Sequence, residues 1–394
     1  MTMTNSFDQL NNRRNTRSYK WDDMKKLFGS SELLPLWVAD MDFGSPPAVH
    51  KAVAERADMG LYGYTFFSDE YYGAISGWFS RRHGWSIDQK WIGNSPTVVT
   101  SISIAVELLS SPGDSVVIQT PVYPPFYEVI EDNGRVVAKN PLVSRNGRYE
   151  MDLPHLETLF QGGAKLMILC SPHNPGGRVW TEEELRAVGA LCLQYGVMVI
   201  SDEIHCDLTF PGHKHIPFAS LSAELSDITV TCAAATKTFN LPGIQTSYYI
   251  TSNKALKQKF DKRLQVLGLN YPHHFAEAAI VAAYTEGEEW LDGLLDYVKG
   301  NLDFAVDYLS AHLPEVKPLI PEGTYLLWVD CRGLGIEAGK LKAWMVEQAK
   351  VAFSLGSAFG TEGAGWLRMN LAAPRAIVEQ ALQQFCEAGR LALK

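Results

Sequence analysis

Short apolar runs that alternate with helical segments occupy the middle of the sequence, and they constrain the fold more than any other feature. Runs without polar interruption are typical of strands that are buried on both faces. Strands that alternate with helices are typical of a mostly parallel sheet covered by helices. The sequence therefore predicts the α/β class. The predicted strands are residues 116–118, 136–138, 166–169, 197–200, 228–232 and 247–250.

Helix signals lie between these runs. Ser95-Pro96 opens a predicted helix over residues 97–109, with proline at its first position. Residues 123–132 form the next predicted helix. A capping box, Thr181 with Glu184 three residues later, begins another helix, and Gly196 ends it.

From about residue 288 the pattern changes. A long predicted helix over residues 290–313 precedes three strands and a closing helix that begins at Pro374, which is typical of a smaller α+β domain. The predicted strands there are residues 325–329, 352–355 and 366–371. We therefore expect an N-terminal arm (1–45) that associates with the small domain, a large domain (46–287) and a small C-terminal domain (288–394).

Composition and charge exclude several classes of protein. The chain has 394 residues and a net charge of −9, with a pI near 5.6, so no basic surface suggests a nucleic-acid partner. The polar N-terminus lacks the apolar segment of a signal peptide. The apolar runs are shorter than the roughly 20 residues of a membrane span. Six cysteines are scattered without a CxxC pair, which indicates reduced, buried thiols and a cytoplasmic protein.

Three polar residues follow three successive predicted strands. Asn174, Asp202 and Lys237 lie just after the runs that end at residues 169, 200 and 232. Ligands bind at the carboxyl ends of strands in such sheets. Taken singly, the three could be a turn asparagine, a capping aspartate and a surface lysine. An amide, a carboxylate and an amine that converge at one edge instead favour a site for pyridoxal 5′-phosphate (PLP).

Each of the three groups has a task in such a site. Lys237, which lies among small residues, would carry the cofactor aldehyde as a Schiff base and, once displaced by the substrate amine, would remove the α-proton. Asp202 would lie against the pyridine nitrogen and keep it protonated, so that the ring accepts electrons. Asn174 would donate a hydrogen bond to the phenolic oxygen of the cofactor.

Further candidates follow from their positions. The predicted helix start at Thr97 and Val98, with Thr236 beside the lysine, would bind the phosphate, although an ordinary helix cap explains the first two equally well. Tyr123 could lie flat on the cofactor ring or belong to the core. Arg368, inside an apolar strand, would bind a substrate carboxylate, unless the strand turns it to solvent.

The motifs around these residues resemble a known family. SPHNPGG, SDEIH, ATKTFNLPG and RMNLAAPR, in this order, are similar to the class I/II aminotransferase superfamily of PLP enzymes (fold type I). The resemblance extends from about residue 34 to the C-terminus. More narrowly, PLWVADMDF, SPTVVTSISIAV, TPVYPPFY, SDEIHCDL and PEGTYLLWVD resemble the cystathionine β-lyase-type carbon–sulfur lyases of the MalY/PatB subgroup.

This resemblance implies a homodimer with shared active sites, in which Tyr64 reaches the neighbouring subunit's cofactor phosphate and contacts substrate. The implied reaction is α,β-elimination on L-cystathionine or L-cysteine-type substrates to give a thiol, pyruvate and ammonia. The resemblance also implies cofactor contacts by Tyr123, Asn174 and Asp202, attachment of the cofactor at Lys237, and binding of the substrate carboxylate by Arg368, with Asn174 nearby.

Two positions depart from the broader aminotransferase pattern. His205 stands where many members have a tyrosine, as in the lyase subgroup, and is a candidate cofactor contact. Gln245 stands where many have an arginine for the phosphate, and the next arginine is Arg263. An aminotransferase is the first alternative, because both reactions share the removal of the α-proton by Lys237.

Two other hypotheses remain. A PLP- or amino-acid-sensing protein that acts on a partner is the second alternative, but we expect no appended DNA-binding domain before residue 34. Zinc binding by His205, His213 and His215 is a weak hypothesis, because residues 211–215 are typical of a polar turn. We therefore predict no metal.

Overall fold

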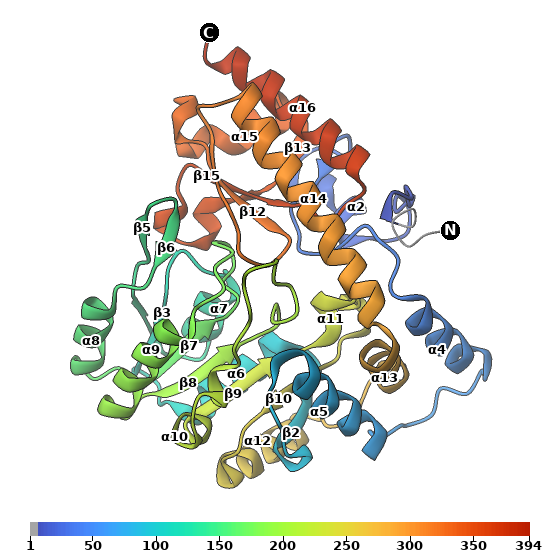
Figure 1. Cartoon of the computed structure of the whole chain (residues 1–394), viewed down its shortest axis with the longest axis vertical. Helices are drawn as coiled ribbons and strands as arrows, with labels where there is room; N and C mark the ends of the chain where they lie inside the picture. The colour runs from blue at the N-terminus through green and yellow to red at the C-terminus, as the bar shows by residue number, and fades with distance from the viewer. Residues whose placement is uncertain (1–6) are drawn as a thin grey trace.

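The computed structural model describes residues 7–394, so the first six residues of the predicted arm lie outside the described chain (Figure 1). Its central element is a seven-stranded sheet. In spatial order, the strands are β2 (Ile92–Ser95), β10 (Ser247–Ile250), β9 (Thr229–Ala233), β8 (Met198–Asp202), β7 (Leu166–Cys170), β3 (Ser115–Ile118) and β4 (Val136–Lys139). Strands β9 to β4 pair in parallel, and β10 is antiparallel to both neighbours. The predicted mostly parallel sheet is confirmed.

Helices cover both faces of this sheet. Successive residues of a strand point to opposite faces, so an apolar strand presents apolar side chains to both of them. Val116 and Ile118 belong to one buried cluster and Val117 belongs to another. An uninterrupted apolar strand therefore needs an apolar layer on each side. One layer contains α6 (Val98–Leu109), α7 (Pro125–Asp132) and α12 (Lys254–Val266), and the other contains α8 (Leu153–Gln161) and α9 (Glu182–Tyr195).

The ends of α9 are those that the sequence predicts. Thr181 accepts a hydrogen bond from the backbone of Glu184, and the Glu184 side chain completes the capping box. Gly196 follows the last turn in a left-handed conformation, with φ of 65°, which glycine adopts without the steric cost of a Cβ atom.

Two predicted helix starts are wrong. Ser95 belongs to β2, where it pairs with Ser247 of β10. Helix α6 therefore begins at Val98 with Thr97 as its N-cap, and Pro96 precedes the helix. Helix α7 begins at Pro125, so Tyr123 lies in the loop before it and not inside a helix.

The C-terminal part of the chain forms a second, antiparallel sheet. Its strands, in spatial order, are β11 (Lys317–Leu319), β12 (Leu326–Asp330), β15 (Trp366–Asn370) and β14 (Ser354–Leu355). The long helix α14 (Glu288–His312) packs along α16 (Arg375–Ala392), as Figure 1 shows at its upper end. Helix α15 (Leu341–Glu347) completes this part.

The prediction of one strand over residues 352–355 is wrong, because this segment contributes to two strands that belong to two different sheets. β13 (Val351–Ala352) pairs in parallel with β1 (Leu34–Pro35) of the N-terminal segment, whereas β14 pairs with β15. The N-terminal segment, with α2 (Tyr19–Asp22) and α3 (Met24–Phe28), therefore lies against the C-terminal part of the chain. The division at residues 45 and 287 stays a prediction.

The remaining elements connect these parts. α4 (Pro47–Asp58) begins with proline, and Ser68 caps α5 (Asp69–His83). α12 and α13 (Ala276–Glu286), the hairpin of β5 (Val143–Arg145) and β6 (Arg148–Glu150), α8, α10 (Ala223–Asp227) and β2 are absent from the prediction. α12 buries only three of its thirteen residues, which leaves a weak periodic signal.

The predictions about the cysteines and about membrane spans can be compared with residues 7–394. Every cysteine is buried there, and none forms a disulfide. Among these residues no helix combines the length and the apolar character that crossing a membrane requires.

Candidate active site

A cavity of about 320 Å³ lies at the carboxyl ends of β7, β8 and β9. Its walls also include the start of α6, part of residues 37–43, which we call the strap, and one residue of β15. Every predicted site residue except Tyr64 lines this cavity. They are Thr97, Val98, Tyr123, Asn174, Asp202, His205, Thr236, Lys237 and Arg368.

Asp202 is the last residue of β8 and lies between two neighbouring strand ends, because it pairs with Cys170 on one side and Cys232 on the other. Its side chain is buried and accepts one hydrogen bond, from the backbone N–H of Ile204 at 3.2 Å. Burial raises the pKa of Asp202 to about 7, because a charged carboxylate is poorly solvated there. A cationic ligand group placed against it would restore the charged form.

Lys237 lies in the short helix α11 (Ala235–Thr238), which closely follows β9. Its Nζ atom donates a hydrogen bond of 2.5 Å to the main-chain oxygen of Ala39 in the strap. Burial, and then the positive charge of Arg368, lowers the pKa of Lys237 to about 8. The lowered pKa increases the unprotonated, nucleophilic fraction of this amine near neutral pH.

Arg368 points into the cavity and not to solvent. Its guanidinium donates to Asn174 Oδ1 at 3.0 Å, to the main-chain oxygen of Trp37 at 2.9 Å and to Ser354 Oγ at 3.2 Å. Its Nε has no partner among residues 7–394. Burial lowers the pKa of Arg368 to about 10, which leaves it cationic and free to bind a carboxylate.

Two aromatic rings complete the walls. Burial, together with the charges of Lys237 and Arg368, lowers the pKa of His205 to about 3, so the imidazole is neutral. Within the described chain its buried Nδ1 atom finds no hydrogen-bond partner. Tyr123 is half-buried, and burial followed by the charge of Asp202 raises the pKa of its phenol.

One end of the cavity suits an anion. The Thr97 side chain caps α6 by accepting from the backbone of Thr100, and Val98 begins the helix, whose N-terminal N–H groups attract phosphate. Thr236 and Gln245 lie at the same cavity. Arg263, the next arginine along the chain, pairs instead with Glu107 at 2.9 Å, so a helix terminus and hydroxyl groups are the anion-binding groups available.

The strap is held from both sides by side chains that sequence analysis did not single out. Asn240 donates to the main-chain oxygens of Met41 and Phe43 and accepts from Met41 N. From the N-terminal segment, Arg13 and Lys20 form ion pairs with Asp42 at 2.9 and 2.7 Å. Contacts between main-chain atoms of one segment and distant side chains leave no local pattern, so only the structure reveals them.

Tyr64 lies outside the cavity and is 94% exposed. Its ring lies against that of Tyr271, with centroids 5.4 Å apart. Other large apolar side chains near Tyr64 or Tyr271 in the sequence are also exposed. They are Leu61, Tyr62, Phe66, Val266, Leu267 and Tyr271.

The interpretation of residues 211–215 as a polar turn is wrong for His215. This residue is buried, and its Nε2 atom lies 2.9 Å from Glu203 Oε2. Glu203 follows Asp202 but points away from the cavity walls, where it also accepts from Ser201 Oγ and the backbone of Phe218. A buried carboxylate requires such partners, which explains why a histidine in an otherwise polar turn is drawn inside.

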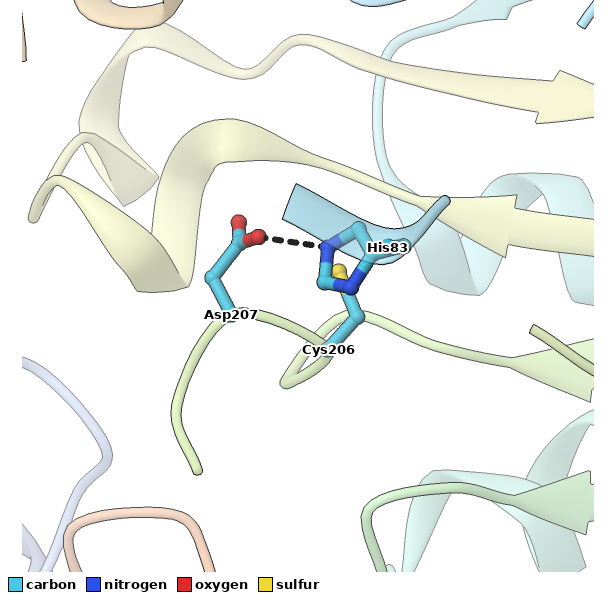
Figure 2. Close-up of side chains that lie close together, drawn as sticks. All are labelled: His83, Cys206 and Asp207. Carbon is cyan, nitrogen blue, oxygen red and sulfur yellow. Dashed lines mark hydrogen bonds and ion pairs between the residues drawn. The ribbon is translucent and has the colours of Figure 1, made fainter. Parts of the chain in front are cut away.

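A second buried polar cluster lies near Lys237. Figure 2 shows His83, from α5, facing Asp207, from the loop after β8, with Cys206 beside the imidazole. His83 Nε2 lies 2.8 Å from Asp207 Oδ1. Sequence analysis missed this cluster because His83 lies more than 120 residues before Cys206 and Asp207.

The residues of the cavity fit PLP. Asp202, a buried carboxylate that forms no ion pair with any residue from 7 to 394, suits the cationic ring nitrogen. The neutral fraction of Lys237 suits the aldehyde, the start of α6 suits the phosphate, and the unpartnered Nδ1 of His205 gives a polar ring contact.

The chain is similar to known proteins over nearly its whole length. A sequence model of the family described as aminotransferase class I and II matches residues 31–385. Cystathionine beta-lyase PatB of Bacillus subtilis (strain 168) is 44% identical over 380 residues, which cover 96% of this chain and 98% of that protein.

Solved structures agree with the sequence relatives. Cystalysin from Treponema denticola, which contains a pyridoxal 5′-phosphate cofactor, matches with a TM-score of 0.93 and 35% identity over 97% of this chain and 98% of that one. The PLP-bound C–S lyase from Staphylococcus hominis matches with a TM-score of 0.91 and 33% identity over 97% of each chain.

Proposed function

Because the chain belongs to the family of class I and II aminotransferases, we propose that it is a PLP-dependent carbon–sulfur β-lyase. Its substrate is L-cystathionine or another L-cysteine derivative, which it converts with water into a thiol, pyruvate and ammonia. Relatives named cystathionine beta-lyase and C–S lyase support this reaction. The observation that carries the proposal is the convergence of Lys237, Asp202, Asn174 and Arg368 in one cavity.

Lys237 is the residue that attaches the cofactor and moves the proton. When bound, PLP accepts the electron pair that remains at Cα after the proton leaves. The pKa of Lys237, about 8, allows the free amine to take the Cα proton near neutral pH and then to deliver it to the departing sulfur. Asp202 holds the ring nitrogen in its charged form, and Asn174 and His205 provide polar contacts to the ring.

Arg368 binds the α-carboxylate of the substrate. Its guanidinium now donates to Trp37 O and Ser354 Oγ, so a carboxylate replaces neutral acceptors with a charged one. Such charge-assisted pairs are stronger than hydrogen bonds to neutral oxygens. Asn174 lies at the same place, since its Oδ1 atom accepts a hydrogen bond of 3.0 Å from the Arg368 guanidinium.

The functional unit is a homodimer. Tyr64 lies against Tyr271, and both are exposed together with large apolar side chains of the neighbouring stretches of chain. Exposed apolar side chains that gather in one area are typical of a protein interface. Tyr64 would then contact the cofactor phosphate and substrate of the partner subunit, which explains its exposure in the isolated chain.

The test is release of pyruvate and thiol from L-cystathionine, L-cysteine and S-alkyl cysteines by the purified protein with PLP. We expect release with the wild type and none with Lys237→Ala. Lys51→Ala, at an exposed lysine of α4, is the matched control and keeps full activity. If the wild type releases neither product from any of these substrates, the lyase proposal is wrong.

The same assay separates the lyase from an aminotransferase, because both begin with the same proton removal by Lys237. A lyase turns over repeatedly without a keto acid. An aminotransferase stops after one turnover unless 2-oxoglutarate or pyruvate is added. We expect turnover that does not depend on 2-oxoglutarate.

A further inference from the structure

Asp207 is a fully buried carboxylate with three side-chain partners from two other elements. It accepts from Trp78 Nε1 at 2.9 Å and from Thr238 Oγ1 at 2.7 Å, and His83 Nε2 lies 2.8 Å away. Trp78 and His83 belong to α5, whereas Thr238 belongs to α11 (Figure 2 shows the His83 contact). Asp207 thus joins the loop after β8 to both helices.

The cluster has the composition of a metal site, since His83, Cys206 and Asp207 place ligand atoms within 4.8 Å of one another. Its hydrogen bonds argue for a different role. Both carboxylate oxygens of Asp207 already accept hydrogen bonds, and Oδ1 faces the His83 ring nitrogen that a metal would need. Burial works to raise the pKa of Asp207, but His83, Thr238 and Trp78 hold it below its usual value. The cluster is therefore a buried carboxylate whose two oxygens are held by the side chains of His83, Trp78 and Thr238.

Thr238 directly follows Lys237 in α11, which has only four residues and no side-chain N-cap among the described residues. A helix this short has little stability of its own, so its orientation depends on the contacts that hold it. Thr238 is completely buried, and its hydroxyl makes one such contact. Asp207 lies five residues after Asp202, the end of β8, and two after His205. This bond therefore joins the helix of Lys237 to the loop that follows Asp202 and carries His205.

We propose that Asp207 is a positioning residue for Lys237, acting through the hydroxyl of Thr238 and braced by His83 and Trp78. This inference rests on the proposed function, since it concerns the amine that attaches the cofactor. Asp207 touches neither cofactor nor substrate in this role. It fixes where the lysine stands relative to Asp202, and small displacements of a reacting group cost large factors in rate.

The experiment compares Thr238→Val, which keeps the shape but removes the donor, with Thr238→Ser, which keeps the hydroxyl. Thr238→Cys, which has a weak donor, is measured beside them. Thr229→Val is the matched control, because the Thr229 hydroxyl is equally buried and donates to a backbone oxygen, that of Leu225, away from the cavity. The readouts are the rate at which full-length apoenzyme captures PLP, followed by visible absorbance, then kcat, KM and the melting temperature.

We expect Thr238→Val and Thr238→Cys to capture PLP at least fivefold more slowly and to lose a similar factor in kcat, with KM within twofold of the wild type. Thr238→Ser and Thr229→Val should stay within twofold in the capture rate. A merely structural role would lower the melting temperature of Thr238→Val and Thr229→Val alike and leave capture unchanged, which would overturn the proposal. If neither the wild type nor any variant releases pyruvate, the proposed lyase function is wrong. The capture rates still decide the role of Asp207 in that case.

Discussion

The Nζ atom of Lys237 donates a hydrogen bond to the main-chain oxygen of Ala39, which lies 198 residues earlier in the chain. The hydroxyl of Tyr325 points to the same oxygen at 3.3 Å. The strap therefore crosses the cavity at the lysine and at Arg368, which donates to Trp37 O. Cofactor and substrate compete with the strap for both cations, so the strap must be held firmly by other groups.

Asn240 is the side chain that holds the strap to the region of Lys237. It makes three hydrogen bonds with the backbone of Met41 and Phe43 and has a left-handed φ of 56°. Asn240→Ala loses the bonds and places alanine in a disfavoured conformation, which should cost about 3 kcal/mol of folding free energy. Asn240→Gly loses only the three hydrogen bonds, so its melting temperature should lie between that of the alanine variant and that of the wild type. Equal melting temperatures for all three would contradict the role of Asn240.

Arg368→Lys tests the carboxylate-binding role. Lysine keeps the charge but cannot form two parallel hydrogen bonds to a carboxylate. We expect kcat/KM for L-cystathionine to fall by roughly 30-fold or more, about 2 kcal/mol, and PLP affinity to change little. Arg332→Lys, at an exposed arginine that pairs with Asp330, should behave as the wild type. An unchanged kcat/KM in Arg368→Lys would show that another group binds the carboxylate.

The parts of the site that the sequence predicts are those that regular structure delivers. Asn174, Asp202 and Lys237 follow strands whose ends share one edge of a parallel sheet, so their convergence follows from the order of the strands. The strap is different, because Ala39 meets Lys237 through its main-chain oxygen, and a backbone atom carries no sequence signature. The burial of His215 escapes sequence analysis for a related reason. Its buried partner Glu203 lies twelve residues away, in a loop whose path no local pattern fixes.

The pH dependence of cofactor capture should report the lysine directly. Only the unprotonated amine attacks an aldehyde, and the pKa of Lys237 is lowered to about 8 by burial and by Arg368. The capture rate of the apoenzyme should therefore rise about tenfold per pH unit below pH 8 and level off above it. Stopped-flow absorbance between pH 6 and 10 measures this. A midpoint near the ordinary lysine value would show that the amine is solvated.

Asp202→Asn should increase the stability of the apoenzyme but weaken its binding of the cofactor. Burial raises the pKa of Asp202 to about 7 from the ordinary 3.8, so the folded apoenzyme binds this proton more tightly than the unfolded chain does. Wild-type stability is therefore lost as pH rises from about 4 to 7, by up to roughly 4 kcal/mol. The asparagine variant avoids this loss. Its apoenzyme should melt higher than the wild type at pH 8, and this advantage should vanish at pH 4.

In the same variant, PLP should bind more weakly, because asparagine cannot hold the ring nitrogen in its charged form. Equilibrium titration of the apoenzyme with PLP measures this affinity. Glu203 is not a suitable control position for this substitution, because its carboxylate already contacts the side chains of His215 and Ser201. A variant that gains stability and keeps full PLP affinity would mean that Asp202 does not face the ring.

Shared active sites in a dimer can be tested by mixing two inactive variants. Lys237→Ala lacks the attachment lysine, and Tyr64→Ala lacks the side chain proposed to enter the partner's site. A hybrid dimer of the two has one site with both defects and one with neither. After unfolding and refolding together, or co-expression, about half of the dimers are hybrids, so activity should recover to about a quarter of the wild-type value.

The control mixes Lys237→Ala with Arg368→Ala. Both residues line the cavity of the same chain, so every site of that hybrid lacks one of them and no activity returns. Size-exclusion chromatography confirms that dimers form in each mixture. If the Tyr64 mixture stays as inactive as the Arg368 mixture although hybrids are present, Tyr64 does not act across the interface. Its exposure on the isolated chain would then serve dimer contact alone.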